Sequence, residues 1–243
     1  MSKAVAIIQA RMGSTRLPGK VLLDLAGRPL IAWSVDRLRR AQTIDQVVVA
    51  TTTRPADNAI ESVCALHGWP CFRGSEDDVL DRYYQAALAH HADTVVRVTA
   101  DCPLVEPEIV DRVLETLLDS RLALDYASNV LPPRTFPRGL DVEVMRFAAL
   151  ERAWTEDRNP ACREHVTPYL YRHPELFRLQ GIFHTPDLSH HRWTVDTLED
   201  LALIRTICDY LGGDRFSWRD ILAAFDEHPE WVDINRHVTQ KQS

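Results

Sequence analysis

The chain has 243 residues, of which 45% are hydrophobic and 26% are charged; these are globular proportions, and the length suits one large domain over residues 1–243. Its formal net charge of −7 argues against a nucleic-acid-binding protein, because such proteins usually carry a basic surplus. Five cysteines without a C-x-x-C pair indicate neither a disulfide framework nor a zinc knuckle.

The first half of the chain alternates strand and helix patterns. Continuous apolar runs, typical of strands buried on both faces, alternate with segments whose apolar residues recur at helical spacing. In chain order we predict a strand over Ala4–Gln9, a helix opening at Pro29, a strand over Gln46–Thr51, a helix over Asn58–His67 that stops at Gly68, a strand over Cys71–Arg73, a helix over Asp77–His91, a strand over Thr94–Thr99 and a helix over Pro107–Asp119. This alternation is typical of βαβ units.

The second half is less regular. We predict a strand and an irregular loop over Leu122–Arg138, strands over Leu140–Met145, Phe177–His184 and Arg192–Val195, and helices over Arg146–Asp157, Pro160–Arg172, Thr197–Leu211 and Ser217–Glu227, the last with Ser217 as its N-cap. The whole chain therefore predicts an α/β fold: a mostly parallel, doubly wound, Rossmann-like sheet with an antiparallel excursion at about residues 125–190.

The sequence also indicates the cellular compartment in which to expect the protein. The first apolar run is too short for a signal peptide with its cleavage site, and no window approaches the roughly 18 apolar residues of a membrane helix. We expect a cytoplasmic protein that binds neither a membrane nor nucleic acid.

The segment RMGSTRLPGK, Arg11–Lys20, follows the first predicted strand and carries three cations. Glycine lets backbone N–H groups approach an anion closely, and Arg11, Arg16 and Lys20 could balance several phosphate charges. The spacing does not fit a Walker A loop, and no G-x-G-x-x-G follows the strand. A solvated surface turn is the alternative, but ligands of doubly wound sheets bind at the carboxyl ends of strands. We therefore interpret this segment as a triphosphate-binding loop.

Two aspartates follow predicted strands. Asp101 comes after Thr94–Thr99, and Asp196 comes after Arg192–Val195. Carboxylates at strand ends suit Mg²⁺, which takes one or two of them together with substrate phosphates. The alternatives are a turn residue for Asp101 and a helix N-terminal charge for Asp196. Thr197 to Asp200 reads as a capping box, so we assign Glu199 and Asp200 to capping or to a solvated face.

The stretch AIIQARMGSTRLPGKVLLDLAGRPLI resembles the N-terminal signature of the CMP-sugar cytidylyltransferases, and among them the spore-coat polysaccharide cytidylyltransferase-like family most closely. Five further stretches are similar to that family: RGSEDDVLDRYYQAA, VTADCPLV, PRGLDVEV, REHVTPYLY and WTVDTLEDL. The resemblance spans roughly residues 4 to 205. It implies the nucleotide-diphospho-sugar transferase fold and a Mg²⁺-dependent nucleotidyltransferase that moves CMP from CTP to an acidic sugar, releasing pyrophosphate, in surface polysaccharide or glycoconjugate biosynthesis.

The resemblance also assigns roles to residues. Lys20, Arg11, Arg16 and Asp101 would carry the reaction, and Asp101 and Asp196 match metal-binding aspartates. The nucleotide would contact Gln9, Ala10, Arg11, Gly13, Ser14, Lys20, Arg73 and Ser75. For Ser75, N-capping of the following helix is an equally good interpretation.

An anionic acceptor needs cations. Arg138 and His165, with Arg163 and Arg192 as further candidates, could hold it, and Asp141 and Glu143 alternate onto one face of a predicted strand. A structural role is an even alternative for His165. The group that activates the acceptor hydroxyl stays open between Asp141, His165 and a metal-bound hydroxyl.

The resemblance implies a homodimer, with residues 125–190 supplying acceptor contacts and the dimer surface. Three other functions compete: a glycosyltransferase of the same fold, although Asp101-Cys102-Pro103 lacks the second Asp of its usual motif; a cytidylyltransferase for a phosphonate or another small acid; and a nucleotide-binding protein without activity.

Overall fold

One sheet of seven strands organises the structure, a computed structural model that describes residues 2–119 and 121–240. The strand order is β5-β4-β1-β6-β8-β7-β9. The first four in that order are parallel: β5 (Cys71–Gly74), β4 (Gln46–Thr52), β1 (Ala4–Gln9) and β6 (Thr94–Thr99). β8 (Glu143–Arg146) runs antiparallel to β6 and to β7 (Tyr126–Ser128), and β9 (Leu179–Gly181) is parallel to β7. The predicted mostly parallel sheet with an antiparallel excursion is confirmed.

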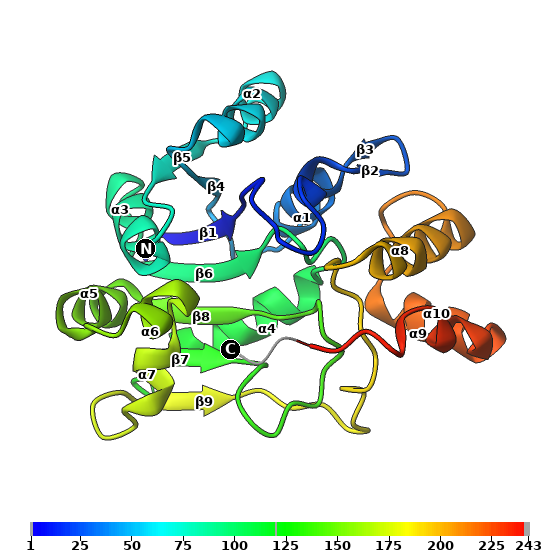
Figure 1. Ribbon diagram of the computed structural model, residues 1–243. Helices are drawn as coiled ribbons and strands as arrows, with labels where there is room; N and C mark the ends of the chain where they lie inside the picture. The colour runs from blue at the N-terminus through cyan, green and yellow to red at the C-terminus, as the bar shows by residue number, and fades with distance from the viewer. Residues whose placement is uncertain (1, 120, 241–243) are drawn as a thin grey trace.

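Helices cover both faces of this sheet (Figure 1). On one face lie α1 (Leu30–Leu38), α2 (Asn58–His67) and α4 (Pro107–Leu118), and on the other lie α3 (Val79–Ala89), α5 (Phe147–Glu156) and α7 (Pro168–Arg172). Each face has its own cluster of buried apolar side chains. Burial on both faces explains why β1 and the centre of β4 read as nearly continuous apolar runs.

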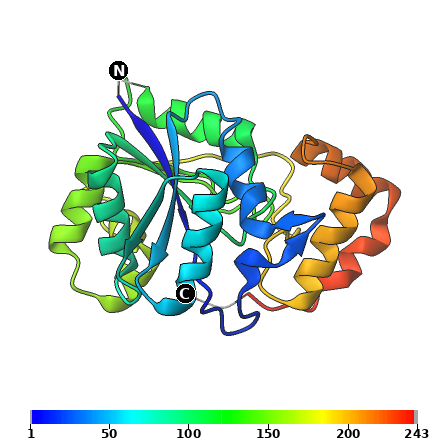
Figure 2. The same cartoon turned by 90° about the horizontal axis from the view of Figure 1, so that it is seen from above.

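The C-terminal helices stand beside the sheet (Figure 2). α8 (Leu198–Leu211) and α9 (Trp218–Glu227) were predicted, and each begins with a capping box, at Thr197 and at Ser217. The short helices η3 (Pro229–Trp231) and α10 (Val232–Asn235) were not predicted. Together they bring the last described residues back towards the sheet.

Several local predictions were incomplete or wrong: the strands predicted over Leu140–Met145 and Phe177–His184 are the shorter β8 and β9. The segment 160–172 is two helices, α6 (Pro160–His165) and α7, because Val166 takes a φ of 70° between them. The segment 192–195 is not a strand, since it makes only an isolated bridge to Arg138. The hairpin of β2 (Asp24–Leu25) and β3 (Arg28–Pro29), preceded by the 3-10 turn η1 (Lys20–Leu22), was not predicted.

The order of the strands places the site. β1 lies between β4 and β6. The connection from β1 to β4 runs through α1 on one face of the sheet, and the return from β5 to β6 runs through α3 on the other face. The strand order therefore reverses beside β1, which makes a crevice at the carboxyl ends of the strands. The loops that follow β1 and β6 begin at this edge. Within the described residues, no helix combines the length and the apolar character needed to cross a bilayer.

Candidate active site

The loop after β1 folds back on itself. The carbonyl of Met12 accepts hydrogen bonds from the N–H groups of Ser14 and Gly19, both at 2.9 Å. Gly19 has a φ of 70°, in the left-handed region that glycine adopts without a steric penalty. This turn directs Lys20 inwards, so that only 8% of the lysine is exposed.

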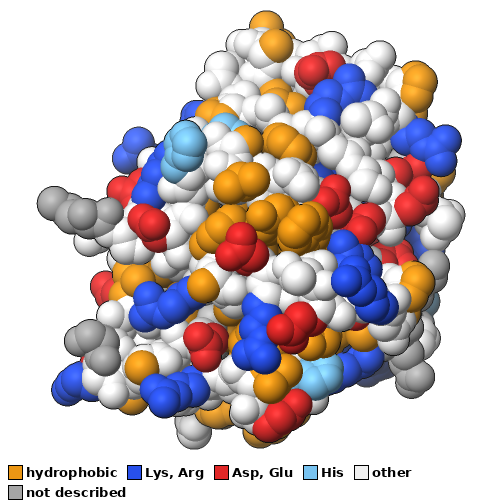
Figure 3. Space-filling model, turned by 90° about the vertical axis from the view of Figure 1, so that its left-hand side faces the viewer, with side chains coloured by type: hydrophobic (Ala, Val, Ile, Leu, Met, Phe, Trp, Pro, Cys, Tyr) orange, Lys and Arg blue, Asp and Glu red, His pale blue; other side chains and the backbone are white. Residues whose placement is uncertain are grey.

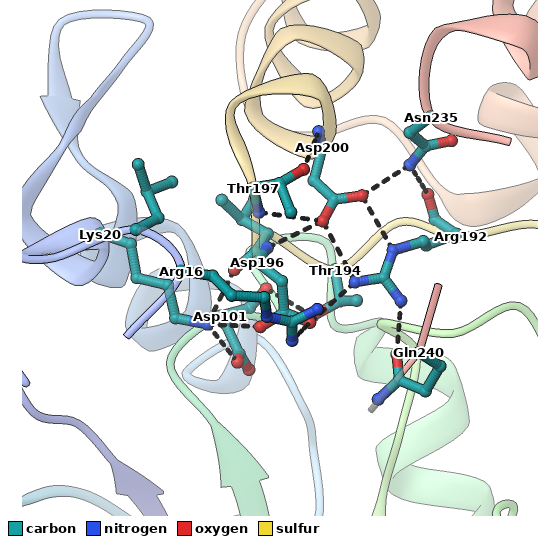
Figure 4. A network of polar contacts seen from close by, with 12 residues as sticks. Arg16, Lys20, Asp101, Arg192, Thr194, Asp196, Thr197, Asp200, Asn235 and Gln240 are labelled. Atoms are coloured by element: carbon teal, nitrogen blue, oxygen red, sulfur yellow. Dashed lines mark hydrogen bonds and ion pairs between the residues drawn. The ribbon is translucent and has the colours of Figure 1, made fainter. Parts of the chain in front are cut away.

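Lys20 lies between two carboxylates (Figure 4). Its Nζ donates to Asp101 Oδ2 at 2.7 Å, to Asp196 Oδ1 at 2.8 Å and to the carbonyl of Val195 at 2.8 Å. Burial alone would lower the pKa of Lys20, but the two aspartates outweigh it and raise that pKa above its ordinary value. The ammonium therefore stays charged although it is buried.

Three cationic side chains form ion pairs with Asp196. Arg16 and Arg192 each approach Asp196 Oδ2 at 2.7 Å, in addition to Lys20 on Oδ1. Burial alone would raise the pKa of Asp196, but Lys20, Arg16 and Arg192 together lower it. The carboxylate is thus ionised, and it is held from three sides.

Asp101 is fixed at the end of β6. The hydroxyl of Thr99 donates to Asp101 Oδ1 at 2.5 Å. The backbone carbonyl of Asp101 accepts from the Thr194 hydroxyl at 3.1 Å and from the Val195 N–H at 2.8 Å. These bonds tie the extended segment 192–195 to β6, and this contact brings Asp196 to Asp101 without a regular strand.

A cavity of about 310 Å³ opens over this cluster. It brings together nine of the residues predicted for the site, which are Gln9, Ala10, Arg11, Ser14, Arg16, Lys20, Asp101, His165 and Asp196. They come from the ends of β1 and β6, the loop Arg11–Lys20, the end of α6 and the segment before α8. The cavity is thus built from segments far apart in the chain.

Three residues predicted to contact the nucleotide are not among those that line the cavity: Gly13, Arg73 and Ser75. Arg73 donates to the carbonyls of Thr52 and Arg54 and pairs with Glu61 at 2.7 Å. The Ser75 hydroxyl accepts from the N–H of Asp78 at 3.0 Å, just ahead of α3. Arg73 therefore ties the end of β5 to the end of β4 and to α2, and Ser75 holds the β5–α3 connection.

Three residues predicted to contact the acceptor also lie elsewhere. Glu143 is buried, where it pairs with Arg97 and accepts from the hydroxyls of Tyr126 and Thr167 at 2.6 Å each. Asp141 pairs with Arg134 at 2.6 and 3.0 Å and precedes β8, so it does not share that strand with Glu143.

Arg138, the third of these, lines a second cavity together with the further candidate Arg192. Arg163, on α6, pairs with Asp78 at 2.8 Å and donates to the carbonyls of Trp154 and Asp157. None of these arginines lines the first cavity.

Arg82 lines the cavity and was not predicted. It is 1% exposed, and its Nη1 donates to the Ser75 carbonyl at 2.7 Å. Burial first and Arg11 next lower its pKa, with Tyr83 opposing them. The signal was in the helical pattern, because Arg82 falls on the inward face of α3 between Val79 and Ala86. A cation on such a face is a candidate for a site.

The acidic side chains of the site indicate whether it could bind a metal ion. No group of three or more His, Cys, Asp or Glu side chains is arranged for metal binding in residues 2–119 and 121–240. Asp101 and Asp196 nevertheless converge on one cation, the Lys20 ammonium. Two carboxylates beside an open cavity fit Mg²⁺, which completes its coordination with water and substrate phosphates.

The chain is similar to known proteins over most of its length. The family model for cytidylyltransferase matches residues 5–210. The spore coat polysaccharide biosynthesis protein SpsF of Bacillus subtilis is 34% identical over 87% of this chain and 89% of its own. A 3-deoxy-manno-octulosonate cytidylyltransferase of Anaeromyxobacter dehalogenans is 42% identical over 47% of each chain. The solved structure of a cytidylyltransferase from Leptospira borgpetersenii is 32% identical and covers both chains fully, with a TM-score of 0.92.

Proposed function

The chain belongs to the cytidylyltransferase family, and from this premise we propose that it transfers CMP from CTP to an acidic sugar and releases pyrophosphate. An acidic sugar is supported by the octulosonate that one relative takes by name, and surface polysaccharide synthesis by the name of another. The acceptor hydroxyl attacks the α-phosphate of CTP, the bond between the α- and β-phosphates breaks, and pyrophosphate leaves.

One observation carries this proposal: Lys20 lies inside a cavity with Arg11 and Arg16, between Asp101 and Asp196. Phosphoryl-type transfer needs positioning and charge neutralisation more than covalent help. Three cations on a loop at the carboxyl end of β1 are suited to the charge of a triphosphate. Arg82 adds a fourth cation to the same cavity.

We propose that Asp101 and Asp196 hold a Mg²⁺ ion when the nucleotide is bound. The ion would supply neutralisation of charge on the α-phosphate and on the leaving pyrophosphate. Lys20 and Arg16 now neutralise these carboxylates. With the ion on these carboxylates, Lys20 and Arg16 would be free to contact phosphate oxygens of the nucleotide.

The acceptor approaches from the side of His165. His165 is half-buried on the cavity wall, and Asp141, the other protein group considered for activation of the hydroxyl, is engaged with Arg134 outside it. We therefore propose that His165 contacts the acceptor. The buried Glu143, with its three polar partners, supports the sheet beside the cavity.

The test is pyrophosphate release from each of the four nucleoside triphosphates with Mg²⁺, against sialic-type, octulosonic and phosphonate acids. We expect release with CTP and a sugar acid. Release of pyrophosphate only with a phosphonate would show that the acceptor is a phosphonate and not a sugar acid. CTP binding without release for any acid would identify a binding protein without activity. Equal thermal stabilisation by all four nucleotides would contradict the cytosine preference.

A further inference from the structure

A second cavity of about 450 Å³ lies between the segment before α8, the C-terminal helices and the last described residues. It shares no lining residue with the first cavity. Its lining residues are Arg138, Ser189, His190, His191, Arg192, Leu203, Phe225, Val232, Asn235, Arg236, Val238 and Gln240. This volume falls in the usual range for small-molecule sites, about 300–1,000 Å³.

The lining has one sign of charge. It includes three arginines and two histidines but no aspartate or glutamate, although acidic residues outnumber basic ones in the chain. Arg192 is already neutralised by Asp196 and Asp200, and Arg236 pairs with the exposed Asp233. The remaining arginine, Arg138, carries the charge that distinguishes this cavity.

Arg138 is half-buried, and it has no hydrogen bond or ion pair from its guanidinium to any residue in 2–119 or 121–240. Burial first, then the neighbouring Arg134 and Arg192, lower its pKa, against the attraction of Asp141. A half-buried guanidinium that faces two like charges and has no carboxylate partner gains from an external anion.

The rest of the lining suits an organic ligand. Leu203, Phe225, Val232 and Val238 supply an apolar surface. Burial lowers the pKa of His191 to about 4, so at neutral pH its ring is an uncharged hydrogen-bonding group. Ser189 and Asn235 add polar atoms. A few convergent polar groups on an otherwise apolar wall are typical of a ligand site.

We propose that the second cavity binds an organic anion, a carboxylate or phosphate monoester with an apolar or aromatic body, through Arg138. This site is separate from the nucleotide cavity and goes beyond the proposed function. The two cavities meet at Arg192, which lines the second and holds Asp196 of the first.

The test is calorimetric titration of the full chain, without CTP or divalent ions, so that a failure of nucleotide transfer leaves it readable. The probes are phenyl phosphate, benzoate, inorganic phosphate and benzyl alcohol. We expect one molecule of phenyl phosphate or benzoate to bind, and the better of the two identifies the anionic group. Inorganic phosphate and benzyl alcohol should bind at least about tenfold more weakly, because each lacks one half of the recognition.

Variants locate the site. Arg138→Gln should weaken binding of the better probe about tenfold or more, and Val238→Trp, which fills the cavity from its half-exposed edge, should do the same. Arg11→Gln, in the first cavity, and Arg39→Gln, an exposed arginine at the C-terminal end of α1, should leave binding unchanged. Absence of binding, binding by Arg138→Gln or Val238→Trp as tight as that of the wild type, or weakening by Arg11→Gln would overturn the proposal.

Discussion

At the residue scale, the carboxylate of Asp101 pairs with Lys20 and is also one of the two that we propose for the metal ion. Its carboxylate neutralises Lys20 in the free protein and, by our proposal, helps to hold Mg²⁺ in the complex. Asp101→Asn keeps the size of the side chain, and Lys20 keeps its bond to Asp196. We expect the fold to persist and the turnover number to fall by about a hundredfold or more, because the ion loses one of two carboxylates. Steady-state pyrophosphate release at saturating Mg²⁺ measures this loss.

A matched control is Asp209→Asn, which removes the same charge from an exposed position on α8. It should leave turnover within about twofold. An Asp101→Asn variant that works at the wild-type rate would rule out the metal role of Asp101.

His191 makes stability depend on pH. Burial lowers its pKa from the ordinary 6.5 to about 4, so between these values the unfolded chain binds a proton that the folded chain does not. The stability that depends on an uncharged His191 is therefore fully present above pH 6.5, and it is lost as the pH falls towards 4. The free energy of unfolding, measured with urea, should therefore fall less steeply in His191→Phe than in the wild type as the pH drops from 6.5 to 4. The difference between the two slopes should stay below the limit for one proton, about 1.4 kcal/mol per pH unit. The exposed His237→Gln should keep the wild-type slope; an unchanged slope in His191→Phe would contradict the assignment.

The sequence predicts the location of a single residue where its immediate neighbours in the chain determine that location. The cations of Arg11–Lys20 and the position of Asp101 follow from a loop and a strand end. The burial of Glu143 does not, because its partners Arg97, Tyr126 and Thr167 come from three other segments of the chain. Their convergence depends on the order of the strands, which alternation along one strand does not contain.

At the element scale, two helices begin in the same way but in different places. The hydroxyls of Thr197 and Ser217 each accept a hydrogen bond from the N–H three residues on, and the carboxylates of Asp200 and Asp220 each accept one from the N–H of the cap residue. Thr197→Ala and Ser217→Ala should each lower the free energy of unfolding by about 1 kcal/mol. Only Thr197→Ala should also reduce turnover, since Asp196 directly precedes that cap. Chemical denaturation and steady-state rates measure the two effects, and equal loss of activity in both variants would mean that the position of Asp196 does not depend on its helix.

Elements whose pattern is fixed locally have the predicted bounds. β1, β6 and α2 begin and end where the apolar runs and Gly68 place them. The interruption of 160–172 was not predicted, because Val166 has a positive φ that its residue type disfavours. The segment 192–195 has the apolar and β-branched residues that are typical of a strand. Its Val195 N–H nevertheless bonds to the Asp101 carbonyl, and the segment does not join the hydrogen-bond ladder of the sheet.

At the scale of the whole molecule, we propose a homodimer that uses the face of α3 and α5. Figure 3 shows hydrophobic side chains gathered on this side of the structure. Rings of Tyr84 and Trp154 stack there at 4.1 Å, and Phe147 lies 5.6 Å from Tyr84. α5 falls within the excursion at 125–190, which the resemblance to the family assigned to dimer contacts. Large apolar surfaces on a folded chain are typical of interfaces.

Leu88 tests this face, because it is 48% exposed on α3, whereas Leu66 is 81% exposed on α2, across the sheet. We expect light scattering to give about twice the chain mass of 27.7 kDa for the wild type. Leu88→Glu should shift the dimer towards monomer by about tenfold or more in dissociation constant, since a carboxylate is costly to bury without a partner. Leu66→Glu adds the same charge outside the interface and should leave the mass unchanged. A wild-type mass near that of one chain at every concentration, or equal dissociation by both variants, would show that α3 and α5 do not form the interface.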